Sequence, residues 1–168
     1  LSNYHLTKKD DQIQKMGFSK KDAVNFVEVE NSKTDYNILR SNLSHYLLKI
    51  FSENVDAEYP QNIFEIGKIF NETDEKEHLA VAICPGNFTK LKQILEYFSK
   101  MIVVEIELEE ADEFPPHFIE GRVAEIFIKN KKIGYIGEIH PKVLKDWKLK
   151  MPVAIFEIDL GEIFERLK

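Results

Sequence analysis

The stretch YPQNIFEIGKIF, residues 59–70, decides the fold because a helix break leads directly into a long run of strand-forming residues. Proline disfavours helix at the residue before it, so Tyr59-Pro60 separates this run from what precedes it. Residues 63–70 are rich in isoleucine and phenylalanine, which favour strands. A charged turn over residues 71–78 then leads into LAVAIC, residues 79–84. The pattern predicts a β-hairpin.

Further strands follow from the same signals on both sides of this hairpin. Residues 123–128 and 133–139 flank the tip KNKK, residues 129–132, as a second hairpin. VEIELE, residues 104–109, alternates strictly, which turns Val104, Ile106 and Leu108 inward and the three glutamates toward water. Additional strands are expected at residues 3–6, 26–30 and 153–158.

Helices are expected where apolar residues recur every three or four positions. One stripe runs from Tyr36 onward through Leu39, Leu43, Tyr46, Leu47, Ile50 and Phe51. Asn87 is placed to cap a helix over residues 88–98, and His140-Pro141 opens a short one. Thr7 is expected to cap a first helix that ends near Gly17, and residues 161–168 form a last helix or a frayed end.

These elements add up to seven or eight strands and four helices, without an internal repeat or a linker. Consecutive hairpins imply a largely antiparallel sheet with helices packed against it. The sequence therefore predicts a single α+β domain over residues 1–168.

Composition narrows the class of protein. The chain has 168 residues, with 29 acidic against 23 basic side chains and a formal net charge of -6. It lacks the roughly 18 consecutive apolar residues that a membrane helix needs and shows no signal peptide, so we expect a soluble, cytoplasmic protein without a membrane partner. Cys84 is the only cysteine and is expected to be buried as a small apolar residue. The acidic balance argues against a large nucleic-acid surface.

No catalytic signature is visible. The glycines form no phosphate-binding loop, and the histidines form no zinc-binding pair. Glu105, Glu107 and Glu109 could hold a cation, but they lie in a row and a solvated strand face is favoured. From the residues alone we assign no catalytic, cofactor-binding or metal-binding residue.

Four segments nevertheless point to one family: residues 36–43 (YNILRSNL), 59–70, 133–144 (IGYIGEIHPKVL) and 151–160 (MPVAIFEIDL). In order and spacing they resemble the catalytic-like core domain of the phenylalanyl-tRNA synthetase β subunit. The chain starts with Leu1 and ends soon after the last segment. We therefore expect a fragment of a longer chain, the C-terminal core of an archaeal or eukaryotic-type β subunit.

The resemblance implies a class II aminoacyl-tRNA synthetase fold and a non-catalytic role. In the family's α2β2 heterotetramer, the α subunit joins phenylalanine to tRNA(Phe) with ATP and Mg, and the β core is a degenerate copy packed against it. An active relative carries an arginine for the ATP phosphate just after the strand at residues 63–70. Here that place holds Asn71, Glu72 and Asp74.

The resemblance also implies glycines and a second arginine near the last strand. Glu157 and Asp159 stand about where those glycines would be, and Glu162 about where the arginine would be. Three carboxylates facing a polyphosphate would repel it. We expect that this chain itself binds no ATP and no Mg.

Three other residues leave alternatives open. Arg40 is either a relic of a ligand contact, a partner contact or, the favoured reading, an ordinary salt bridge at the start of a helix. A structural role is favoured for Arg122. Glu65 lies either on the polar face of the sheet, which is favoured, or in a residual pocket.

Three functional hypotheses remain. The first is a scaffold that packs against the α subunit through the helix after Leu39 and the first-helix region. The second is a retained site for ATP or adenylate. The third is a free-standing paralogue that binds an amino acid, or RNA through the lysines of residues 129–132.

Overall fold

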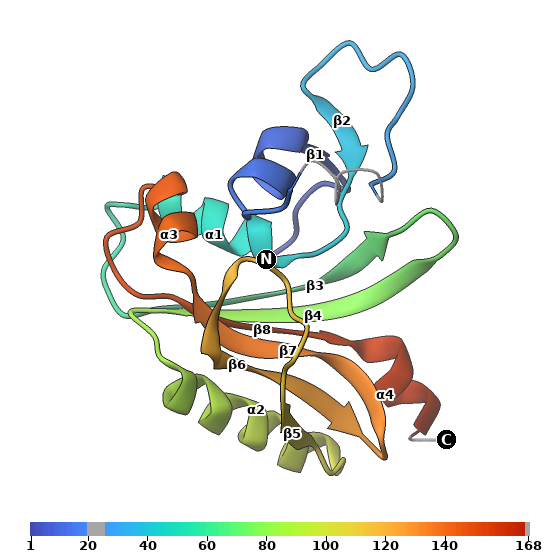
Figure 1. Cartoon of the computed structure of the whole chain (residues 1–168), viewed down its shortest axis with the longest axis vertical. Coiled ribbons are helices and arrows are strands. Elements are labelled where there is room, and N and C mark those ends of the chain that lie inside the picture. Colours follow the sequence, from blue (N-terminus) through green and yellow to red (C-terminus); the bar gives the residue numbers. More distant parts are fainter. Residues whose placement is uncertain (20–25, 167–168) are drawn as a thin grey trace.

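The computed structural model describes residues 1–19 and 26–166. Its centre is a six-stranded antiparallel sheet in the order β3-β4-β8-β7-β6-β5, with helices on both faces (Figure 1). This confirms the predicted α+β class with an antiparallel sheet. The strands are β3 (Gln61–Phe70), β4 (Glu75–Cys84), β5 (Glu107–Glu110), β6 (Phe118–Ile128), β7 (Lys131–Ile139) and β8 (Ala154–Asp159).

Both predicted hairpins are confirmed. β3 and β4 pair without interruption from Gln61 opposite Cys84 to Phe70 opposite Glu75. The charged residues that the sequence placed in the turn thus extend β4, and only residues 71–74 form the loop. In the second hairpin, Lys129 and Asn130 both have positive φ, as a two-residue turn with the twist of the sheet requires.

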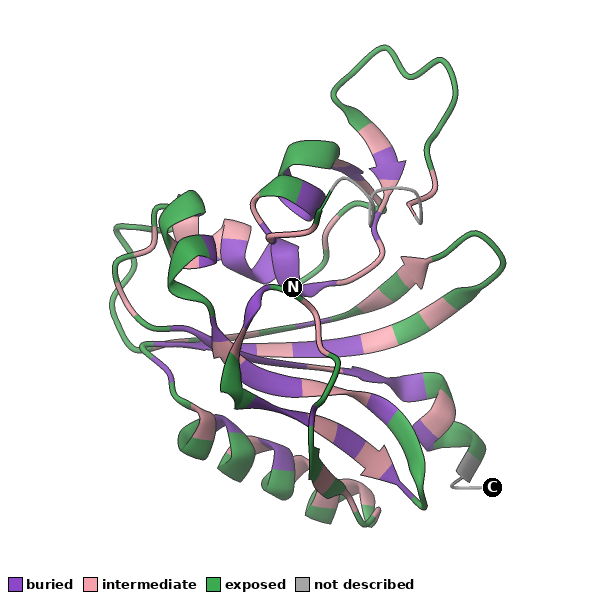
Figure 2. Ribbon diagram, in the orientation of Figure 1, coloured by how far each residue is buried: buried purple, intermediate pink, exposed green. Residues whose placement is uncertain are grey.

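The helices divide the core into two layers. α1 (Ser44–Glu53) covers one face of the sheet, where Leu47 and Phe51 pack against Ala80 and Ile155. On the opposite face, Leu91 and Leu95 of α2 (Phe88–Ile102) pack against Phe156. Figure 2 shows the buried stripe along α1 and the central strands. Two shorter α-helices are α3 (Pro141–Asp146) and α4 (Leu160–Arg166).

The predicted cap at Asn87 and the predicted helix start at His140-Pro141 are confirmed. The Asn87 side chain accepts a hydrogen bond from the Lys90 amide at 2.8 Å. The His140 ring accepts one from the Lys142 amide at 3.1 Å, and Pro141 occupies the first helical position. These contacts satisfy amides that a helix leaves unpaired at its start.

The predictions for the N-terminal third are partly wrong. Residues 36–39 do not begin a helix. They form β2 (Tyr36–Leu39), which pairs with β1 (Leu6–Lys8) in a second, two-stranded sheet. α1 therefore begins only at Ser44. The strand-forming residues of β2 are stabilised by a partner about thirty residues away, and helical spacing could not reveal that pairing.

Three smaller corrections concern the same region. Thr7 caps no helix because it lies within β1. The first helix is a short π-helix, η1 (Asp10–Gln14), whose N-cap position is Lys9 without a side-chain cap. The strand expected at residues 3–6 overlaps β1 only at Leu6, and residues 26–30 contribute only an isolated bridge from Glu28 to Ile38.

The segment at residues 104–109 behaves as its alternation predicts, although its strand is short. Val104, Ile106 and Leu108 are half-buried against the α2 side of the core, while Glu105, Glu107 and Glu109 are exposed. Only Glu107–Glu110 pairs with β6 as β5. Among the helices in the described ranges, none is both long and apolar enough to cross a membrane.

Candidate functional site

A cavity of about 470 Å³ lies over the C-terminal half of β8, on the face of the sheet that carries α1. Its lining brings together three of the positions singled out in the sequence: Glu157, Asp159 and Glu162. Residues 41–44, the segment before β6 and the tip of the β6–β7 hairpin complete its walls. The three carboxylates that the resemblance singles out therefore lie around one hollow.

Glu157 points from β8 to the start of α1. Its carboxylate accepts hydrogen bonds from the Leu43 amide at 3.0 and 3.1 Å, and from the Ser44 amide and hydroxyl at 3.0 and 2.6 Å. The His78 ring donates a further one from Nδ1 at 3.0 Å. A carboxylate at a helix N-terminus also interacts favourably with the helix dipole. Glu157 is thus a tertiary cap for α1.

The ionised form of Glu157 is favoured although the residue is half-buried. Burial of the carboxyl by itself raises its pKa. The hydrogen bond and charge of His78, together with the donors of Ser44 and Leu43, outweigh burial and lower the pKa of Glu157 below its ordinary value. Both oxygens are engaged with protein groups, so this carboxylate has no free capacity to coordinate a ligand.

Asp159 and Glu162 are also neutralised by neighbours. Asp159 accepts a hydrogen bond from Lys76 at 2.9 Å and caps α4 through the Glu162 amide at 3.3 Å. Burial by itself raises the pKa of Asp159, but the contact with Lys76 lowers it overall. Glu162 forms an ion pair with Lys131. The site is therefore not the unbalanced acidic surface expected from the sequence.

The loop between β3 and β4 contributes one of its three predicted residues. Asn71 lines the cavity, and its side-chain oxygen accepts hydrogen bonds from the amides of Thr73 and Asp74. Glu72 and Asp74 are exposed and lie outside the lining. No residue of this loop is an arginine, so the guanidinium that the resemblance implies for an active relative is not found in residues 71–74.

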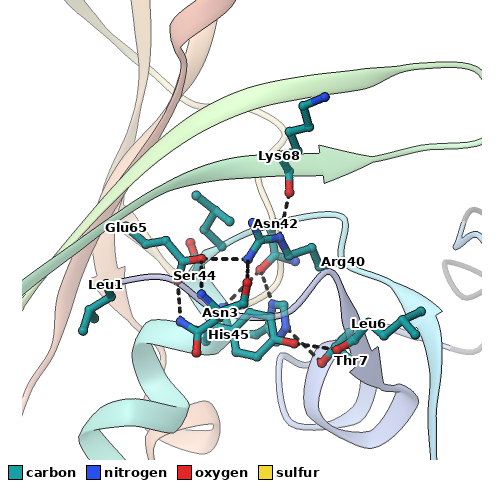
Figure 3. Close-up of polar contacts among 12 residues, drawn as sticks. Leu1, Asn3, Leu6, Thr7, Arg40, Asn42, Ser44, His45, Glu65 and Lys68 are labelled. Carbon is teal, nitrogen blue, oxygen red and sulfur yellow. Dashed lines mark hydrogen bonds and ion pairs between the residues drawn. The ribbon is translucent and has the colours of Figure 1, made fainter.

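Arg40 and Glu65 form a buried ion pair at the edge of the sheet, away from the cavity lining (Figure 3). Their side chains are 2% and 1% exposed, and Arg40 Nη1 lies 2.7 Å from Glu65 Oε1. Arg40 also donates to the Lys68 carbonyl at 2.7 Å, and Asn3 donates to Glu65. Arg40 does form the favoured salt bridge, but the pair is buried and joins the end of β2 to β3 instead of lying at the start of a helix. Glu65 is neither exposed on a polar face nor part of the cavity.

Gly67 makes this ion pair possible. A Cβ atom at Gly67 would lie 2.2 Å from Arg40 Nη2, so any larger residue would push the guanidinium away from the strand. The backbone carbonyl of Arg40 also accepts a hydrogen bond from the Phe70 amide at 2.8 Å. Arg40 thereby covers part of the open edge of β3, which is an outer strand.

Arg122 and the hairpin lysines have structural contacts. Arg122 pairs with Glu138 at 2.7 Å, and Glu138 in turn accepts the amide of Phe88 at 3.0 Å. Lys132 contacts Glu125 and the Tyr135 hydroxyl, both at 2.5 Å. Because Lys131 is paired as well, the charge of this tip is largely balanced, which weakens the RNA-binding hypothesis.

His78 and His117 are the site residues that the sequence did not reveal. Isolated histidines give no spacing signal in the sequence. His78 of β4 lies opposite Asp159 of β8, and Glu157 lies two residues before Asp159, so His78 and Glu157 are on the same face of the sheet. His117 lines the cavity and is buried, and its Nδ1 has no hydrogen-bond partner. Burial lowers the pKa of His117 to about 4, so its ring is neutral near pH 7.

Metal binding finds no support in the residues that the structure describes. Over residues 1–19 and 26–166 there is no group of three or more histidine, cysteine, aspartate or glutamate side chains placed to hold a metal ion. Cys84 is buried in the core as expected, and burial raises the pKa of its thiol.

Sequence comparisons agree with the residue patterns. The model of the phenylalanyl tRNA synthetase beta chain CLM domain matches residues 1–160. The phenylalanine–tRNA ligase beta subunit of Thermococcus kodakarensis is 42% identical over 148 residues, 82% of this chain and 25% of that protein. The corresponding subunit of Pyrococcus abyssi is 34% identical over 174 residues, 98% of this chain and 31% of that protein.

The chain thus spans about a quarter to a third of the length of these curated relatives. A pyrrolysyl tRNA synthetase, PylSc of Desulfitobacterium hafniense, has a similar structure with a TM-score of 0.75. The match covers 98% of this chain and 60% of that one at 14% identity, so it supports the fold alone. Together with the family match, these findings show that the chain belongs to the family of phenylalanyl-tRNA synthetase β-chain CLM domains.

Proposed function

We propose that the chain is the C-terminal, catalytic-like core of a phenylalanine–tRNA ligase β subunit and that it does not itself activate phenylalanine. In the whole enzyme, an α2β2 heterotetramer in the cytoplasm, the α subunit would carry out ATP- and Mg-dependent attachment of phenylalanine to tRNA(Phe). This core would pack against α. The family match and the relatives' names support this assignment.

The hydrogen bonds of Glu157 are the main support for a non-catalytic role. At a place where the family's active members have glycine, a half-buried carboxylate is held by α1 and His78. A nucleotide phosphate there would meet an anion whose removal from its donors would leave buried amides unpaired. The same group that excludes ATP therefore also stabilises the fold.

In the structure, the surface expected to contact the α subunit differs from the one expected from the sequence. The apolar stripe of α1 is not available to a partner, because Leu47, Leu48 and Phe51 are fully buried within this chain. Phe64 and Ile66 of the edge strand β3 are instead 55% and 49% exposed and lie on the same face. Adjacent exposed apolar residues are typical of protein interfaces. We infer that the α subunit covers Phe64 and Ile66.

Gel filtration of this chain mixed with the α subunit tests the proposal. We expect co-elution at micromolar concentration, and its loss in the double variant Phe64→Ser/Ile66→Ser. The matched control is Tyr97→Ser/Met101→Ser, which removes two apolar side chains of similar exposure from α2. Failure of the unaltered chain to bind α would count against the scaffold role, and equal loss in both variants would count against this surface.

A further inference from the structure

The strand β5 forms one edge of the six-stranded sheet, and its outer side has no partner in the described part of the chain. β5 pairs over its whole length with β6 alone. In an antiparallel pair, every second residue turns its backbone N–H and C=O outward. Within residues 1–19 and 26–166, no hydrogen bond from outside the sheet reaches these outward groups of β5. An edge of this kind can accept a further strand.

The opposite edge of the sheet, at β3, is partly covered by the chain itself. The backbone carbonyl of Arg40 accepts the outward amide of Phe70, and the Arg40 guanidinium donates to the outward carbonyl of Lys68. Proteins commonly cover their sheet edges in this way. β5 has no such cover among the described residues, so the two edges differ in what they leave available to a partner.

A groove of about 230 Å³ lies between α2 and β5 (Figure 1). It is lined by Lys92, Leu95, Glu96 and Ser99 of α2 and by Ile106 and Leu108 of the strand segment. Its polar groups already have partners, because Lys92 and Glu96 pair at 3.7 Å and the Ser99 hydroxyl donates to a backbone carbonyl. The groove is smaller than most small-molecule sites, which span about 300–1,000 Å³. It suits one or two apolar side chains of a neighbouring strand.

The other face of β5 carries unpaired negative charge. Alternation turns Glu107 and Glu109 away from α2, and both are exposed, as is Glu110. None of the three forms an ion pair with a described residue. On the neighbouring strand β6, by contrast, Glu125 is neutralised by Lys132. Because opposite charges on adjacent strands stabilise a sheet and like charges destabilise it, β5 favours a basic neighbour.

Charge also argues against two other occupants of this edge. Antiparallel pairing of two β5 strands would bring the glutamates of two copies of this chain together on one face, which is unfavourable. A nucleic acid would be repelled by the same carboxylates. A segment with lysine or arginine at every second position and apolar residues between them matches both faces, with its basic side chains beside Glu107 and Glu109.

We propose that the outer edge of β5 binds an extended, basic segment of a partner protein by strand addition. The backbone of the segment pairs with the outward groups of β5, and its apolar side chains enter the groove against Leu95 and Leu108. This inference does not depend on the scaffold role, because the α subunit is expected at β3, at the opposite edge of the sheet. Both partners can therefore be bound at once.

The probe is a short peptide in which lysine and valine alternate, titrated into the isotope-labelled chain and followed by two-dimensional amide NMR. We expect saturable shifts confined to residues 92–99 and 105–110, and slower hydrogen exchange of the outward amides of β5. A peptide of the same composition with its lysines in one block should bind at least roughly tenfold more weakly. A fully N-methylated peptide keeps every charge but has no backbone donors, and it should not bind. Absent shifts, shifts elsewhere or equal binding of the N-methylated peptide would each overturn the proposal.

Two charge variants separate this edge from general attraction to an acidic protein. Glu107→Lys/Glu109→Lys should weaken binding of the alternating peptide roughly tenfold. The matched control, Glu72→Lys/Asp74→Lys, makes the same change in net charge at exposed residues beside the opposite edge and should keep its affinity. Both variants should still co-elute with α. Equal weakening in both variants would overturn the proposal, and so would a dimer of the unaltered chain that Glu107→Lys/Glu109→Lys abolishes in sedimentation velocity.

Discussion

The Glu157 carboxylate caps α1 by accepting both the amide and the hydroxyl of Ser44, at 3.0 and 2.6 Å, across 113 residues of chain. The contact ties the last strand of the sheet to the first long helix. In the proposed function, it also places an ionised group where the resemblance implies a nucleotide site in an active relative. A single interaction would thus account for both the stability of this region and the proposed lack of ATP binding.

Replacing this carboxylate should destabilise the fold. In Glu157→Gln an amide nitrogen faces donors that need an acceptor, so we expect a loss of about 1–3 kcal/mol in the free energy of unfolding at neutral pH. Urea denaturation measures the loss, with Glu105→Gln on an exposed strand face as the control. Equal stabilities of Glu157→Gln and the unaltered chain would contradict the capping role.

The same variant gives a prediction about acid. Because the folded-state pKa of Glu157 is lowered below 4.5, its contribution is present above that pH and is lost as pH falls through the lowered pKa. The difference in stability between the unaltered chain and Glu157→Gln should therefore shrink below pH 4.5. A difference that is independent of pH would show that the charge of the carboxylate contributes nothing.

Two buried histidines should govern stability at milder pH. Burial lowers the pKa of His45 to about 3 and that of His117 to about 4, both from 6.5. Below pH 6.5 the unfolded chain takes up protons that the folded chain does not, so each histidine removes about 1.4 kcal/mol per pH unit. Urea titrations between pH 7 and pH 5 should show the free energy of unfolding falling with the summed slope of the two histidines. In His117→Leu only the contribution of His45 remains, so the slope should be reduced by about half. An unchanged slope would contradict a neutral, buried His117.

The ion pair at the sheet edge predicts strong coupling between its partners. Arg40→Met leaves Glu65 buried and unpaired, which should cost about 3–5 kcal/mol. The double variant Arg40→Met/Glu65→Leu should lose less than the single variant, because an apolar pair replaces both charges. Unfolding measurements on the single and double variants provide the test. Additive losses would show that the two side chains do not depend on each other.

A substitution at the C-terminal end of α2 should stabilise the protein. Val103 adopts a left-handed conformation with φ 56° and ψ 43°, which a β-branched residue disfavours, and it is 87% exposed. Val103→Gly should therefore raise the free energy of unfolding by about 1 kcal/mol. Val103→Ala keeps a Cβ atom and should gain less. A loss of stability in the glycine variant would mean that the valine side chain has a contact of its own.

Local signals in the sequence were sufficient for the sheet and most of its helices. The hairpin at Ile63 and the cap at Asn87 depend on neighbours within a few residues, and both were predicted correctly. The spacing of apolar residues wrongly predicts a helix over β2, because the strand that pairs with it, β1, lies far away in the sequence. Periodicity cannot report such a pairing.

The site was predictable in position but not in its charge balance. The resemblance located Glu157, Asp159 and Glu162, and all three line one cavity. Their partners Lys76 and His78 come from β4, more than seventy residues away, and no spacing rule connects them. The burial of Glu65 likewise depends on Arg40 crossing Gly67, a contact between separate elements.

Calorimetric titration of this chain with MgATP tests the central claim most directly, with an active α subunit measured alongside as the positive control. Because Glu157 is held by α1 and His78, and because the loop directly after β3, residues 71–74, contains no arginine, we predict no saturable heat at millimolar nucleotide. Saturable binding of MgATP with a micromolar Kd would contradict the account of a structural, non-catalytic core.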